Sequence, residues 1–181
     1  MRKYLLFACL FLSFFVHAQD TAWSRIIIDE NVEVTLPEIS TKLDTVIRRE
    51  GISFKTKIYH SNAGNRTLNF TVSESNESIK LTEESIAGLK AGVSRSAKRQ
   101  GLKCSFKDTV IKGQYCFKTI CFFDKISDPA LYQYGFPSGD KMYSIVYYLQ
   151  RGEDIKKQGM DLARLLNGIS FKNPLLPLPP D

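Results

Sequence analysis

The sequence has few of the residues that most catalytic and metal sites require. It holds two histidines and four cysteines in 181 residues, with no Cys-x-x-Cys, no histidine pair, no Gly-x-Ser-x-Gly and no glycine-rich phosphate loop. A metal site needs several such ligands, and a hydrolytic triad needs a nucleophile beside a histidine. We therefore expect no catalytic residues, no metal and no cofactor, and we do not expect an enzyme.

Long apolar runs are absent except at the start of the chain. Arg2 and Lys3 precede an apolar run of 13 residues from Tyr4 to Val16, and Val16-His17-Ala18 resembles a cleavage site. A membrane-spanning helix needs roughly 20 apolar residues, so this run is too short to span a bilayer. We therefore expect residues 1–18 to be a signal peptide, with export of the mature chain to the periplasm or the outside.

Strong charge of either sign is also lacking. The chain has 25 basic and 19 acidic residues, and loss of Arg2 and Lys3 leaves 23 minus 19, or +4. Such a small excess does not indicate a nucleic-acid partner. The 43% hydrophobic content and the length predict one domain over 19–172. Residues 173–181 hold four prolines and should be extended, either as a docking peptide or as a trailing terminus.

Alternating and helical hydrophobic patterns divide the domain into strands and two helices. Thr82 is a predicted N-cap, Gly101 a predicted stop, and the spacing of Gly88 and Gly92 predicts a close approach of this helix to the sheet. The second helix covers 153–167. Predicted strands cover 31–36, 52–59, 68–72, 102–109, 114–123, 141–150 and 169–171. This order predicts an α+β domain, with a largely antiparallel β-sheet and two main helices packed on it.

Three segments carry a resemblance to a known family. They are Val32-Glu33-Val34-Thr35-Leu36-Pro37, Val110-Ile111-Lys112-Gly113-Gln114-Tyr115, and the closing helix that leads into Gly168-Ile169-Ser170-Phe171. Together with the element order, they resemble the PsbP-like family over about residues 23–172, and the chain also resembles small exported Bacteroidota proteins of unknown function. The resemblance implies an αβα sandwich that acts by binding other proteins.

The mature chain is left with three cysteines, an odd number for an oxidising compartment. If a hairpin turns at Lys112-Gly113, facing residues have numbers that sum to 225, which places Cys104 opposite Cys121 within disulfide range. A slip of one residue would separate the two sulfurs, and three ordinary buried thiols are the competing interpretation. Cys116 is then the candidate free thiol.

Two groups of residues are candidate binding sites. The segment Asp124–Asp140 is predicted as a long loop that carries Tyr132, Tyr134 and Phe136 at alternate positions. These rings either form a recognition loop for a protein or a glycan, or they cover a sheet edge. The second group is Arg95, Lys98 and Arg99, which either form a phosphate or lipid-headgroup site or complement the helix dipole. His60, the one mature histidine, is expected to be structural.

These observations predict an exported, non-catalytic interaction module that binds another envelope or secreted component, with a protein as the expected partner. The alternative is a small-molecule or lipid-binding protein of the periplasm. Its ligand would lie between the sheet and the helix, near Gly88 and Gly92.

Overall fold

The structure is a computed structural model that describes residues 22–49, 52–63, 66–75, 82–123, 129–138, 140–149 and 155–172. The predicted signal peptide and the proline-rich segment 173–181 lie outside the described residues. Within the described ranges, neither helix combines the length and the apolar character that crossing a membrane requires.

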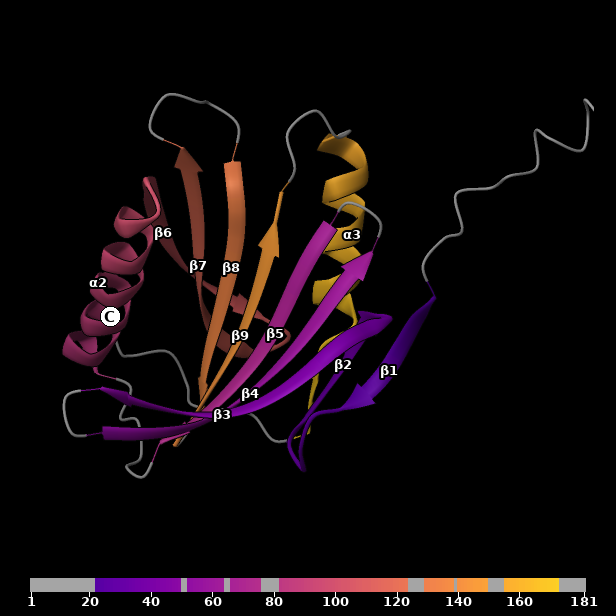
Figure 1. The fold of residues 1–181 in the computed structure, drawn as a ribbon, viewed down its shortest axis with the longest axis horizontal. Coiled ribbons are helices and arrows are strands. Elements are labelled where there is room, and N and C mark those ends of the chain that lie inside the picture. Colours follow the sequence, from indigo (N-terminus) through magenta and orange to yellow (C-terminus); the bar gives the residue numbers. More distant parts are fainter. Residues whose placement is uncertain are drawn as a thin grey trace, which may run out of the picture.

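In the described part of the chain, ten strands form two sheets and are paired antiparallel throughout (Figure 1). The small sheet has the order β1-β2-β10, with β1 at Trp23–Ile27, β2 at Val32–Pro37 and β10 at Ser170–Phe171. The large sheet has the order β3-β4-β5-β9-β8-β7-β6. Its strands are β3 (Ile39–Arg49), β4 (Ile52–Ala63), β5 (Arg66–Ser75), β6 (Leu102–Ile111), β7 (Gln114–Phe123), β8 (Pro129–Ser138) and β9 (Lys141–Tyr148).

The large sheet consists of two meanders that meet in its middle. Strands β3 to β5 form the first and β6 to β9 the second, and the pairing of β5 with β9 joins them. Phe70, for example, faces Ile145 across this junction. Residues far apart in the sequence therefore share the centre of the sheet.

The first helix, α2 (Glu83–Arg99), begins where the sequence predicts. Thr82 Oγ1 accepts a 3.1 Å hydrogen bond from the Ser85 amide, and Ser85 Oγ accepts a 2.9 Å bond from the Thr82 amide. This reciprocal capping satisfies two amides that the helix itself leaves without partners. Gly101 follows the helix with a φ of 71°, a conformation that suits glycine.

The second helix, α3 (Ile155–Asn167), is fastened at its C-terminal end by the β6–β7 turn. The ammonium of Lys112 donates to the main-chain carbonyls of Asn167 and of Ile169, the latter at 2.7 Å. Lys112 and Gly113 both have positive φ, as a two-residue hairpin turn requires. This turn therefore holds the end of α3 while it sets the pairing of β6 with β7.

The predicted αβα sandwich, with two main helices packed on one sheet, is wrong. Of the described residues, 64% are in strands and 22% in helices, and the strands form two sheets. Helix α2 contacts β6 at one edge of the large sheet, whereas α3 packs against β2 of the small sheet. The prediction missed β1, β3 and β8. Strand β3, for instance, is mostly exposed on both faces and so lacks the alternation that signals a half-buried strand.

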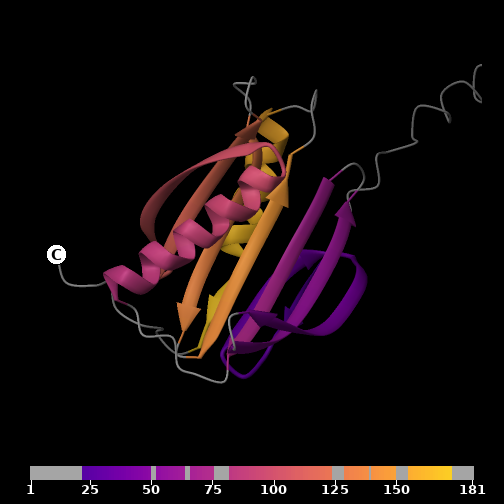
Figure 2. The same cartoon turned by 60° about the vertical axis from the view of Figure 1, so that its left-hand side comes forward.

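The main core lies between the two sheets and α3. One face of the large sheet contributes Phe70, Phe136 and Ile145, and these pack with Leu36 of β2 and Leu165 of α3. A smaller cluster lies on the opposite face beneath the C-terminal end of α2, and includes Ala97, Leu102, Cys121 and Leu131. Figure 2 shows α2 in front of the orange strands of the second meander, with the purple strands of the first meander beside it.

Candidate functional site

The predicted recognition loop over Asp124–Asp140 is wrong, because residues 129–138 form β8 in the interior of the large sheet. The exposed fraction is 3% for Tyr134 and 0% for Phe136, and the Phe136 ring packs against Phe171 with 5.3 Å between centroids. Tyr132 is half-buried beneath the ammonium of Lys118. The three aromatic side chains therefore share one sheet face and do not project from a loop as a recognition surface.

The cysteines lie in the predicted register. Cys104 faces Cys121 across β6 and β7, and the two form a disulfide. Cys116 has a free, buried thiol, and burial raises its pKa to about 12. A thiol that stays protonated at neutral pH is a poor nucleophile. The disulfide therefore links β6 to β7, and the Cys116 thiol is part of the core.

The predicted close approach of α2 to the sheet at its glycines is also wrong. A Cβ atom built at Gly88 or at Gly92 would meet nothing within 4 Å. Helix α2 therefore makes no tight contact with the sheet at Gly88 and Gly92, the region predicted to hold a small molecule or a lipid. Arg95, Lys98 and Arg99 are exposed on the last turns of the same helix.

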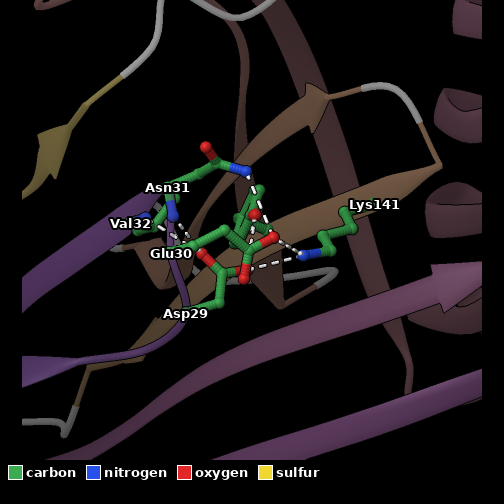
Figure 3. A network of polar contacts seen from close by, with 6 residues as sticks. Asp29, Glu30, Asn31, Val32 and Lys141 are labelled. Carbon is green, nitrogen blue, oxygen red and sulfur yellow. Dashed lines mark hydrogen bonds and ion pairs between the residues drawn. The ribbon is translucent and has the colours of Figure 1, made fainter.

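A cluster of polar contacts joins the two sheets (Figure 3). Asp29, in the turn between β1 and β2, accepts hydrogen bonds through Oδ1 from the amides of Asn31 at 2.9 Å and Val32 at 3.0 Å. Its Oδ2 accepts from the Tyr143 hydroxyl at 2.7 Å and from the Lys141 ammonium at 3.2 Å. Lys141 also donates to Glu30 at 2.9 Å. We call these contacts the inter-sheet clamp.

The charges of the inter-sheet clamp are those of a structural ion pair. Burial alone would raise the pKa of Asp29, but the hydrogen bonds from Tyr143, Asn31, Lys141 and Val32 outweigh it and lower that pKa. The hydrogen bond to Glu30 raises the pKa of Lys141, and burial raises that of Tyr143. A catalytic lysine or tyrosine needs the opposite shift to lose its proton near neutral pH. These shifts keep Asp29 charged and leave Lys141 and Tyr143 protonated at neutral pH.

A second ion pair fastens α2 to the sheet. Asp108 on β6 accepts from Lys90 of α2 at 2.8 Å and from the Tyr115 hydroxyl at 2.8 Å. Burial would raise the pKa of Asp108, but these two hydrogen bonds lower it overall. Within the described ranges, no group of three or more His, Cys, Asp or Glu side chains is placed to hold a metal ion.

The face of the large sheet that carries α2 also bears a continuous group of neutral polar side chains. Strand register places His60 beside Asn69 and Thr71 beside Ser144. It also places Gln133 beside Val146, and Val146 packs against the small core cluster beneath α2. Ser73 follows two residues after Thr71 and so shares this face. We define the polar face as His60, Asn69, Thr71, Ser73, Gln133 and Ser144.

Hydrogen bonds between strands order several of these side chains. His60 Nδ1 lies 2.6 Å from Asn69 Oδ1, and Gln133 Nε2 donates to Ser144 Oγ at 3.2 Å. Ser73 Oγ lies 3.1 Å from Thr56 Oγ1, at the margin of the polar face. All six side chains are half-buried. The polar face therefore presents preorganised amide, hydroxyl and imidazole groups without any carboxylate or ammonium.

The sequence analysis missed the polar face, although β5 carries a signal for it. Thr67, Asn69, Thr71 and Ser73 alternate there with the buried Leu68, Phe70 and Val72. The alternation predicts a strand with one wet side, and the complete lack of charge on that side is the feature that could have been noticed. The contributions of β8 and β9 depend on pairings that no local pattern reveals.

Comparison of the chain with family models, with curated proteins and with solved structures gives no match. The resemblance to the PsbP-like family therefore stays a prediction.

Proposed function

We propose that the protein is an exported, non-catalytic interaction module that binds a protein component of the envelope or the secreted fraction through the polar face. The observation that supports this proposal is the neutrality of that face. Six half-buried hydrogen-bonding side chains lie together on β4, β5, β8 and β9 without a charge among them.

A contrast within the molecule supports this choice. On the opposite face of β3 and β4, the exposed positions carry charge, as Lys42, Asp44 and Lys57 do. Charged side chains keep a sheet face in water, because removing their hydration costs far more than removing that of a hydroxyl or an amide. The cores of protein interfaces are depleted in charge for the same reason. The polar face therefore has the composition of a surface that a partner can cover.

The chemistry of the side chains favours a neutral polar partner. Asn69 and Gln133 each offer a donor and an acceptor, and so do the hydroxyls of Thr71, Ser73 and Ser144. These groups match the amides and carbonyls of a polypeptide. They provide no cation for a phosphate backbone, so we propose a protein partner and no nucleic acid.

Photocrosslinking in the native cell tests this proposal. A benzophenone amino acid replaces Thr71 on the polar face and, as the control, the exposed Val110 on β6. We expect a covalent adduct of one defined size from position 71 and not from position 110, and mass spectrometry of the adduct names the partner. An equal adduct from both positions, or none from position 71, would contradict the proposal.

The purified partner then allows a quantitative test. Thr71→Lys and Ser144→Lys place a charge in the middle of the polar face on two paired strands, and Val110→Lys adds the same charge elsewhere. We expect the first two variants to weaken binding at least about tenfold, because a buried unpaired ammonium is costly, and the third to leave it unchanged. Circular dichroism confirms that each variant is folded.

A further inference from the structure

Strand β3 is an edge of the large sheet, and no described strand pairs with its outer side. It is 11 residues long, and its apolar side chains are exposed: 52% for Leu43, 56% for Val46 and 37% for Ile47. A long, exposed edge with apolar side chains is a template for pairing with another chain. Strand β3 is therefore suited to strand addition.

The other edge of the same sheet is protected. Helix α2 contacts β6, and β6 carries the exposed lysines Lys103 and Lys107. Lysines and a covering helix are the usual devices that keep a sheet edge from pairing. The contrast indicates that β3 is the edge of the large sheet that is open to pairing, and β6 the edge that is protected from it.

The order of charges along β3 favours a second copy of the same strand as the pairing partner. Lys42, Asp44, Val46 and Arg48 are alternate residues, so they lie on one face, and all four are exposed. Consider an antiparallel pair of β3 strands related by a two-fold axis at Val46, so that facing residues have numbers that sum to 92. Val46 then faces Val46 of the second copy, and Asp44 faces Arg48 of the second copy. The strand is thus complementary in charge to itself.

The neighbouring registers are less favourable. An axis at Asp44 places two carboxylates opposite each other, and an axis at Thr45 places Lys42 opposite Arg48. An axis at Leu43 pairs Lys42 with Asp44, but the irregularity between Ile39 and Thr41 then limits the ladder to five residues of each strand, Thr41 to Thr45. The axis at Val46 uses seven residues, from Leu43 to Arg49, all within the regular part of the strand.

We propose that the protein forms a two-fold symmetric dimer in which β3 pairs antiparallel with β3 of a second copy in the register that sums to 92. The pairing joins two seven-stranded sheets into one continuous sheet of fourteen strands. An axis perpendicular to the sheet keeps equivalent faces on the same side. The two polar faces would therefore be directed to the same side, although the dimer does not depend on the function proposed for them.

The affinity of this dimer follows from its size. A ladder of seven residues and its flanking side chains bury less than the roughly 1,600 Å² of a standard stable interface. We therefore expect a reversible dimer with a dissociation constant in the micromolar range. Sedimentation equilibrium of the purified protein, expressed with its own leader, measures that constant at concentrations from about 1 to about 300 μM.

A charge swap tests the register. Asp44→Arg places two arginines opposite each other, and Arg48→Asp places two aspartates opposite each other. Each variant should raise the dissociation constant about tenfold or more, and the double variant should restore it to within about threefold of the unmodified value. Glu84→Arg and Arg95→Asp make the same changes of net charge at exposed positions of α2 and should have no effect.

Cysteine substitution gives a second readout that does not depend on charge. In the proposed register, Val46→Cys brings two thiols within disulfide range across the axis, whereas Leu43→Cys does not. The two positions are similarly exposed, so they form a matched pair. We expect a covalent dimer from Val46→Cys after mild oxidation. A protein that stays monomeric throughout the concentration range, a double charge variant without rescue, or a covalent dimer from Leu43→Cys alone would overturn the proposal.

Discussion

The hydroxyl of Tyr143 donates a 2.7 Å hydrogen bond to Oδ2 of Asp29, and this contact joins β9 of the large sheet to the turn between β1 and β2. The other oxygen of the same carboxylate holds the turn itself through two amides. One side chain thus shapes a loop and fixes it to a different sheet. The inter-sheet clamp consequently holds the small sheet against the large sheet on this side of the core.

The first prediction concerns Asp29→Asn, which keeps the shape of the side chain and removes its charge. The Lys141 ammonium then loses one of its two carboxylate partners. If the new amide nitrogen takes the place of Oδ2, it faces the Tyr143 hydroxyl and the Lys141 ammonium, which are both donors. We expect the free energy of unfolding to fall by about 2 kcal/mol in urea denaturation. The control is Glu38→Gln, at an exposed position between β2 and β3, which should change it by less than about 0.5 kcal/mol. Equal effects would show that the clamp does not hold the sheets together.

The second prediction concerns the dependence of stability on pH. Asp29 and Asp108 have pKa values below the ordinary value of 3.8, because hydrogen bonds favour their charged forms in the folded state. A lowered pKa means that the unfolded chain binds protons first, so the contribution is fully present above pH 3.8 and is lost as the pH falls through the folded-state values. We expect the free energy of unfolding to decline over that acidic range. Asp29→Asn should decline less steeply than the unmodified protein, and parallel curves would count against this assignment.

A third prediction comes from the packing of Phe117 against Gly135 on the neighbouring strand. A Cβ atom on Gly135 would lie 2.8 Å from Cε2 of the Phe117 ring and closer still to two other ring atoms. Gly135→Ala should therefore displace the ring and lower the free energy of unfolding by about 1–3 kcal/mol. Gly88→Ala is the matched control, because a Cβ there meets nothing and alanine favours a helix. That variant should be more stable by about 0.5–1 kcal/mol. Thermal unfolding of both variants measures the difference.

Local signals explain which elements the sequence could predict. Thr82 and Gly101 delimit α2 because capping depends on neighbouring residues, and Lys112-Gly113 determines the register of β6 and β7 because a two-residue turn leaves no freedom. Strand β8 lies in the segment predicted as a loop, and this segment holds Pro129, Gly135 and Pro137, which are residue types common in turns. In the fold, both prolines lie near the ends of β8, and Gly135 leaves room for a ring.

Non-local pairing explains what the sequence could not predict. The polar face exists because β5 pairs with β9, which brings Thr71 beside Ser144 from the other meander. No pattern within either strand states that they are neighbours. The small sheet is similar, since β10 near the end of the chain pairs with β2 near its beginning. The separation of the two helices follows from these pairings, which is why the layered arrangement was predicted wrongly.

The last prediction concerns the cysteines, whose chemical behaviour should differ sharply. Cys116 has a buried thiol with a pKa raised to about 12, so the folded protein should not react with iodoacetamide at that position at neutral pH. In denaturant without reductant, Cys116 should be labelled while Cys104 and Cys121 remain protected by their disulfide. Replacing both of these cysteines by serine removes a cross-link over a sequence separation of 17 and should lower the free energy of unfolding by about 2–4 kcal/mol. Peptide mass spectrometry identifies the labelled site, and rapid labelling of Cys116 in the folded protein would show that β7 opens far more readily than its buried position implies.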